Sequence, residues 1–186
     1  MRVGLLLVLL FAVPAAAGTL DLSLNDESAR GDFGWQVTEQ HLVANVSWFH
    51  HEDRADLVGL GLHAAGQATF GNDVYGGVGL NAVWGDDDVN DGFGVGLGGF
   101  FRWGFTRSGR VGLLVDLHHA PEMFSGGDLE GYTEFSAGIG YRILTTAEVH
   151  VSYRHIELEP ESGSDSELSE DLMFGFRLRW GRDSER

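Results

Sequence analysis

The 186-residue sequence predicts an all-β fold, an antiparallel β-barrel of about ten strands, from three observations. Apolar residues recur at every second position through most of the chain after residue 18, and this is the period of a β-strand. All five tryptophans fall on the apolar phase of the alternation. The segments between the alternating runs are short and long in turn, as in a row of antiparallel hairpins with two unlike ends.

The first 18 residues are expected to be a signal peptide that is not part of the barrel. Arg2 gives a positive start, VGLLLVLLFAV an apolar core and PAAAG a cleavage site of small residues. The apolar run is too short to cross about 30 Å of hydrocarbon as a helix, which favours cleavage over a membrane anchor. We therefore expect one further domain, the barrel, over residues 19–186.

Ten runs of alternating apolar residues define the expected strands. They lie at 20–24, 33–37, 42–48, 58–62, 78–84, 93–105, 111–117, 135–143, 149–153 and 172–180. The apolar phase switches from even to odd positions between Leu24 and Phe33. One bulged strand through both would leave nine strands, an awkward number for a bacterial barrel. We expect ten strands and keep eight as the alternative.

Glycine or polar residues occupy the positions between the apolar ones, so each strand has one apolar and one polar face. A soluble sandwich or lipocalin-like barrel alternates in the same way. The tryptophans favour lipid outside, because they lie near strand ends, where membrane barrels carry girdles of aromatic residues. Their positions are Trp35, Trp48, Trp84, Trp103 and Trp180. An even strand number also lets the first strand pair with the last, leaving no free edge in lipid.

The expected connections differ between the two ends of the barrel. Short turns lie at 38–41, 67–73, 106–110 and 145–147, and long acidic loops lie at 25–32, 50–56, 85–92, 119–132 and 157–171. If the chain starts on the periplasmic side, the long loops lie outside the cell, as in bacterial outer-membrane barrels. The spacing of the acidic residues is not that of an EF-hand, so we expect no cofactor beyond loosely bound divalent cations.

Residues 94–99 read GVGLGG and match the GxGxxG pattern of a dinucleotide-binding loop. A relaxed form recurs at 59–64 and 77–82, and no amphipathic helix follows any of the three. Repetition in successive strands indicates glycine on a lumen-facing phase and no nucleotide site. The even-numbered glycines of 94–98 are expected to face the lumen, and Gly99 to face outward and mark a bulge or a bend.

Composition excludes two further classes of function. The formal charge is −16, whereas a nucleic-acid-binding surface needs clustered positive charge. The chain has no cysteine, so it has neither a disulfide framework nor thiol chemistry. We expect no nucleic-acid partner.

Charged residues of both signs fall on the polar face and are the candidate lumen-lining residues. They are Arg102, Asp116, Glu134, Arg142, Glu148, Arg154, Arg177 and Arg179. Ten strands enclose a lumen wider than that of an eight-stranded barrel but far narrower than that of a porin of about 16 to 18 strands. Ion pairs across the lumen would plug it, and a remaining water path would pass only small solutes. The expected function is a structural barrel or a narrow porin-like channel.

Histidines near carboxylates raise the alternative, an outer-membrane barrel enzyme or metal-binding protein. The residues concerned are His50, His51, His118, His119 and His155, at the expected outer ends of strands. Imidazole and carboxylate groups hold transition metals or activate water, as in omptin-type barrel proteases. Interfacial polar residues in a chain with eight histidines explain the same pattern. No catalytic residue is assigned, and the five histidines are weak candidates for metal ligands.

The segment MFGFRLRW at 173–180 is similar to the C-terminal signal of outer-membrane barrels, although GRDSER follows it where the signal usually ends the chain. The barrel assembly machinery recognises an apolar or aromatic residue at the end of that signal. We therefore expect this machinery as a partner, together with outer-membrane lipid and lipopolysaccharide.

Four segments together resemble the YfaZ family of bacterial outer-membrane proteins. They are LDLSLNDESARGDFGW, WFHHEDRADLVGLGLHAAG, HHAPEMFSGGDLEGYTEFSAGIGYRIL and VHVSYRHIELE, in this order over nearly all of the expected mature chain. The matched features are the Asn/Asp turn, the APE segment after a strand, and the paired GYR and SYR, the second with Ser152 where glycine is expected. The resemblance implies an outer-membrane β-barrel of a Gram-negative bacterium. It implies no established reaction and no catalytic residue.

Overall fold

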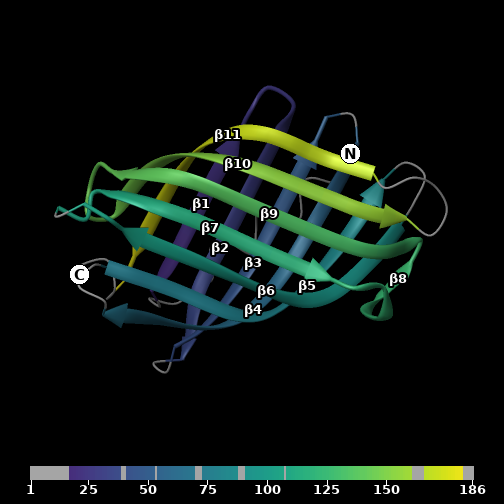
Figure 1. Cartoon of the computed structure of the whole chain (residues 1–186), viewed down its shortest axis with the longest axis horizontal. Coiled ribbons are helices and arrows are strands. Elements are labelled where there is room, and N and C mark those ends of the chain that lie inside the picture. The colour runs from purple at the N-terminus through teal and green to yellow at the C-terminus, as the bar shows by residue number, and fades with distance from the viewer. Residues whose placement is uncertain are drawn as a thin grey trace.

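The structure is a computed structural model, and it describes residues 17–38, 41–52, 54–69, 73–87, 91–106, 108–160 and 166–181. Within these residues the chain forms one antiparallel sheet that closes on itself (Figure 1). Ten strands build the wall: β1 (Gly18–Leu24), β2 (Ser28–Thr38), β3 (Leu42–His51), β4 (Ala55–Thr69), β5 (Asp73–Asp87), β6 (Asp91–Gly104), β7 (Val111–Ala120), β9 (Leu129–Arg142), β10 (Ala147–Pro160) and β11 (Ser166–Trp180). Residues 1–16 of the expected signal peptide lie outside the described residues.

The first and last strands close the barrel. Gly18 pairs with Trp180 and Leu24 pairs with Phe174 in antiparallel register. Each of the ten strands therefore has a partner on both sides, and no strand edge of the wall is left to face lipid. This confirms the predicted closed barrel of ten strands over the alternative of eight.

The switch of apolar phase between Leu24 and Phe33 marks a tight hairpin. The Asn25 side-chain oxygen accepts hydrogen bonds from the backbone N–H of Glu27 at 3.0 Å and of Ser28 at 2.6 Å. It also accepts one from the Ser28 hydroxyl at 2.8 Å. Asparagine favours turns because its side chain can satisfy backbone donors in this way. The Asn25 turn therefore separates β1 from β2.

The connections at the two ends are less unequal than the sequence predicts. We call the end where β1 begins and β11 stops the termini end, and the other the loop end. At the loop end only residues 25–27, 52–54 and 88–90 separate three of the hairpins. The prediction of long acidic loops was therefore wrong at most of these positions. The acidic residues prolong the strands, because continued pairing satisfies their backbone donors and acceptors.

The longest connection is at the loop end and joins β7 to β9. It contains the short helix η2 (Glu122–Phe124) and the three-residue strand β8 (Ser125–Gly127), which pairs with the start of β6. Within the described residues, no helix is long and apolar enough to span a membrane.

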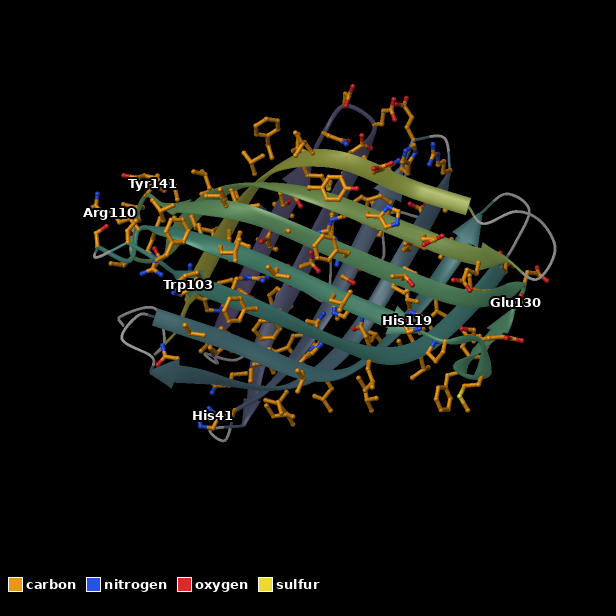
Figure 2. The ribbon with its side chains drawn as sticks, in the orientation of Figure 1. His41, Trp103, Arg110, His119, Glu130 and Tyr141 are labelled. Atoms are coloured by element: carbon orange, nitrogen blue, oxygen red, sulfur yellow. The ribbon has the colours of Figure 1, made fainter. Side chains whose placement is uncertain are left out.

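The two faces of the wall are apolar outside and polar inside. Outward-facing Val78 and Leu97 are each 71% exposed, whereas inward-facing Glu134 is 2% exposed. Aromatic residues of the outer face gather near the strand ends, and Figure 2 shows Trp103 and Tyr141 toward the termini end. An exposed apolar belt around a polar interior is the reverse of a soluble protein and is the surface that a bilayer requires.

The GVGLGG stretch lies inside β6. Its register with β5 is unbroken, with Gly98 opposite Gly79 and Gly99 opposite Val78. The predicted bulge at Gly99 was therefore wrong. Glycine is required there for close approach, because a Cβ atom at Gly99 would lie 2.8 Å from the carbonyl oxygen of Gly77.

Candidate functional site: the filled lumen

Glu134 of β9 is the centre of an ion-pair cluster inside the barrel. Its carboxylate accepts a hydrogen bond from the Tyr132 hydroxyl at 2.6 Å and one from Arg154 of β10. Arg30 of β2 lies 2.9 Å away, measured from its Nη1 to the Glu134 Oε1. His118 of β7 is the fourth neighbour, with its Nδ1 3.6 Å from the Glu134 Oε2. Two arginines therefore compensate one carboxylate that has almost no access to solvent.

The pair between Arg30 and Glu134 crosses the lumen. Three strands, β1, β11 and β10, lie between β2 and β9 along the wall. Arg30 is also held by Asp32 on its own strand, through bonds of 2.6 Å from Nε and 3.0 Å from Nη2. The guanidinium group is thus fixed at one end and bridges to the far wall at the other.

A second cluster lies on the wall formed by β1, β10 and β11. Arg177 contacts Asp21 through Nε at 2.7 Å and Nη2 at 2.5 Å. Its Nη1 lies 3.3 Å from Glu148, which Arg179 contacts at 2.9 Å. His150 completes the cluster, with its Nε2 3.5 Å from Asp21. These pairs also join the two strands at which the barrel closes.

A third pair, between Arg102 of β6 and Asp116 of β7, lies on the opposite side. The Arg102 Nη2 donates to the Asp116 carboxylate at 2.8 Å, and Nη1 donates to the carbonyl oxygen of Val115 at 2.9 Å. The guanidinium carbon also lies 5.7 Å from the centre of the Phe100 ring. The arginine is therefore bound on three sides.

An apolar cluster fills the lumen at the loop end. It is built from six strands and consists of Phe49, Ala55, Leu57, Val83, Ala120, Leu129, Tyr132 and Ile156, with Leu158 packed against it. Phe49 is 1% exposed and Ile156 is fully buried. These residues face inward at the ends of strands whose outer faces carry polar groups, so the sequence pattern of the belt does not reveal them.

Several buried polar atoms of the lumen have no hydrogen-bond partner among the described residues. The side-chain oxygens of Asn45 and Asn81 both lie against Gly61, and the Nε2 of His63 and the Nδ1 of His118 also have no hydrogen-bond partner. The hollow that Asn81 and His118 line in part is too small to enclose an organic ligand.

The structure places the eight candidate lumen residues on the inner face, where seven of them form the ion pairs described above. The eighth, Arg142, has a buried Nε without a hydrogen-bond partner. Sequence reasoning missed Asp21 and Arg30. Asp21 alternates with Leu20 and Leu22, so its phase was a usable signal, whereas Arg30 stood in a stretch assigned to a loop.

The five candidate metal ligands are divided between the two faces of the wall. His50 faces outward, pairs with Asp56 at 2.7 Å and stacks on Trp48 with ring centres 5.9 Å apart. His119 is also exposed, and His155 is half-buried on the outer face, whereas His51 and His118 are buried on the inner face. Within the described residues, no three His, Cys, Asp or Glu side chains gather as a metal site.

Comparison with known proteins identifies the family. The family model described as YfaZ precursor matches residues 1–180. The chain belongs to the YfaZ family. Outer membrane protein YfaZ of Escherichia coli (strain K12) is 29% identical to it over 137 residues, which is 71% of this chain and 69% of that protein. This confirms the resemblance seen in the sequence.

Two solved barrels are similar to this YfaZ-family chain at low identity. The KdgM porin, in a complex with disordered oligogalacturonate, is 6% identical with a TM-score of 0.44 over 89% of this chain and 99% of that one. The NanC porin is 7% identical with a TM-score of 0.39 over 89% and 98%. The barrel topology of the YfaZ-family chain is established by its own strand pairings.

The YfaZ-family barrel lies in the bacterial outer membrane, surrounded by lipid. Family membership and the exposed apolar belt agree on this location.

Proposed function

We propose that this protein is a structural barrel of the outer membrane with a sealed lumen. The observation that carries the proposal is the apolar cluster at the loop end. Phe49, Leu57, Val83 and Ile156 come from β3, β4, β5 and β10, so they converge from much of the circumference. A constriction of this kind excludes water and ions, as hydrophobic gates do in channels.

The ion-pair clusters inside the barrel support the proposal independently. The Arg30–Glu134 bridge and the Arg177–Asp21 pair fill the interior with side chains that are held at both ends. Opening these clusters would break contacts between charges that have little access to solvent. Removing one partner of a buried pair costs about 3 to 5 kcal/mol, so spontaneous opening is rare.

Conductance in planar bilayers tests the sealed barrel. The wild-type protein, inserted after a heat-modifiable gel shift has shown that it is folded, is expected to give no current steps. The triple variant Phe49→Ala, Ile156→Ala, Arg30→Ala shortens two side chains of the apolar cluster and one of the Glu134 ion-pair cluster. This variant is expected to give current steps. A matched variant, Leu80→Ala, Leu97→Ala, Ile139→Ala, shortens three outward side chains and is expected to remain silent. Steady current through the wild type would overturn the proposal.

A narrow channel for small solutes is the second candidate. It is favoured by the polar lining of the lumen, where Asn45, Asn81 and His63 present buried atoms without partners. Such atoms commonly bind water, and a chain of waters would be the start of a conducting path. Wild-type currents that change in Arg142→Ala or Glu134→Ala would support this candidate.

The proposal assigns no catalytic step and no resident metal. The histidines that suggested them occupy both faces of the wall, and His50 and His118 therefore cannot bind one tetrahedral ion together. Divalent cations that associate loosely with the acidic strand ends remain compatible with a sealed barrel. Calorimetric titration with Zn²⁺ tests the assignment, and tight stoichiometric binding would contradict it.

A further inference from the structure

The connection between β7 and β9 repairs a gap in the wall. β7 pairs with β6 only from Leu97 to Gly104, although β6 begins at Asp91. β8 fills part of the missing length, pairing Gly92–Gly94 of β6 with Ser125–Gly127. The backbone N–H of Asp128 also donates to the carbonyl oxygen of Asp91 at 3.0 Å. We call residues 121–128 the outer flap, and Figure 1 shows its strand β8 at the loop end.

The outer flap is held in place by its own hydrogen bonds. The Pro121 carbonyl accepts one from the backbone N–H of Phe124 at 2.9 Å and one from the Ser125 hydroxyl at 3.2 Å. Gly126 lies against the ring of Phe93, because a Cβ atom added there would be 2.9 Å from the Phe93 Cε1. Phe93 belongs to the lipid-facing belt and pairs with Trp84 of β5. The flap is therefore continuous with the outer surface of the barrel.

The apolar side chains of the outer flap have little protein around them. Met123 is 77% exposed and Phe124 is 56% exposed, which is comparable with Leu97 at 71% and Leu80 at 59% in the lipid-facing belt. Acidic Glu122 and Asp128, which flank them in the flap, are also exposed. One short segment thus presents two large apolar groups between two carboxylates, beside an established lipid-facing aromatic residue. Burial of apolar area draws such side chains into the boundary between lipid headgroups and acyl chains.

We propose that the outer flap is an interfacial anchor that inserts Met123 and Phe124 among the acyl chains of the lipid around the loop end of the barrel. Glu122 and Asp128 stay at the aqueous level and fix the depth of insertion. The surrounding lipid is the occupant that the observations favour, because Gly126 of the flap rests on Phe93, which already faces it. A protein partner would instead leave both side chains in water in the isolated barrel.

Spin labelling tests the anchor cleanly because the chain contains no cysteine. Single variants Met123→Cys and Phe124→Cys carry a nitroxide label, and the barrel is refolded in phospholipid vesicles. Power-saturation spectroscopy measures collisions of each label with molecular oxygen, which concentrates in lipid, and with a water-soluble nickel complex. Leu97→Cys serves as the lipid-facing reference, and Asp128→Cys in the same flap serves as the aqueous control.

For labels at 123 and 124, the ratio of oxygen collisions to nickel collisions is expected to be several-fold higher than for the label at 128. It is expected to approach the ratio for the lipid-facing label at 97. Ratios equal to that at 128 in a barrel whose gel shift shows it to be folded would overturn the proposal and leave a protein-binding flap as the explanation. Because each label replaces an exposed side chain, folding is expected to be preserved. The readout does not depend on whether the lumen conducts.

Discussion

The two halves of the barrel wall fill the lumen in opposite ways. On β9, β10, β11, β1 and β2, long charged side chains point inward, with Glu134, Arg177 and Arg30 among them. On β4, β5 and β6 glycine is the commonest inward residue, and three of these glycines belong to the GVGLGG stretch. Ten strands enclose too little space for long side chains on every strand. A narrow lumen that is filled by long side chains from some strands therefore needs small residues on the others.

Besides the Arg102–Asp116 ion pair, the glycine half of the lumen is filled by aromatic and imidazole rings. His63 lies 5.8 Å from Phe100 and 6.0 Å from His118 between ring centres. Glycine lies beneath all three rings. A Cβ at Gly61 would be 2.7 Å from the His63 ring, one at Gly77 would be 2.8 Å from the Phe100 ring, and one at Gly98 would overlap the His118 ring. The charged half is thus stabilised by ion pairs and the glycine half by close packing, and the two are expected to respond differently to mutation.

The largest effect is expected in the charged half. Glu134→Ala leaves the guanidinium group of Arg154 buried without its carboxylate and leaves Arg30 with Asp32 alone, and it should lower the free energy of unfolding by about 3 to 5 kcal/mol. Urea unfolding of the barrel in vesicles, followed by heat-modifiable mobility, measures the change. Asp56→Ala is the matched control, because the exposed His50–Asp56 pair is expected to contribute about 1 kcal/mol or less. Equal losses in the two variants would show that the lumen network does not stabilise the barrel.

A smaller loss of stability is expected in the glycine half, where an added Cβ atom would collide with the backbone of a neighbouring strand. A Cβ atom in Gly96→Ala would overlap the carbonyl group of His119 and force β6 and β7 apart, at a cost of about 1 to 3 kcal/mol. Gly66→Ala is the control, since nothing lies within 4 Å of the added atom. The same unfolding measurement should leave this control close to wild type. Loss of stability in both would mean that alanine is unfavourable in these strands for reasons other than contact.

The sequence predicted the wall better than its contents. Period two fixes which face each residue takes, so the ten strands and the inward position of Glu134 or Arg177 could be predicted. Period two does not tell which distant strands meet across the lumen. The Arg30–Glu134 bridge depends on the stagger of strands that are over a hundred residues apart in the chain.

The missed features share one physical cause. Acidic residues near Asp91 and Glu157 predict loops if polarity ends a strand, yet strand pairing continues through them. Arg30 was missed for the same reason, because it lies in the expected loop at 25–32. The inward cluster around Phe49 and Ile156 was hidden for the converse reason: apolar residues there lie on the phase that carries polar groups elsewhere. The surroundings of a strand differ between its middle and its ends, so one alternation pattern cannot describe the whole strand.

The smallest effect is expected at the hairpin that carries Asp21 and Arg30 into the charged half. Asn25→Ala removes the acceptor of three hydrogen bonds, and because the turn is partly exposed, water replaces some of them. A loss of about 1 kcal/mol is expected in urea unfolding. Asn25→Asp keeps an oxygen in place and should retain most of the stability. If both variants lose the same amount, the turn is held by strand pairing alone, and the charged half does not depend on the Asn25 turn to position Arg30.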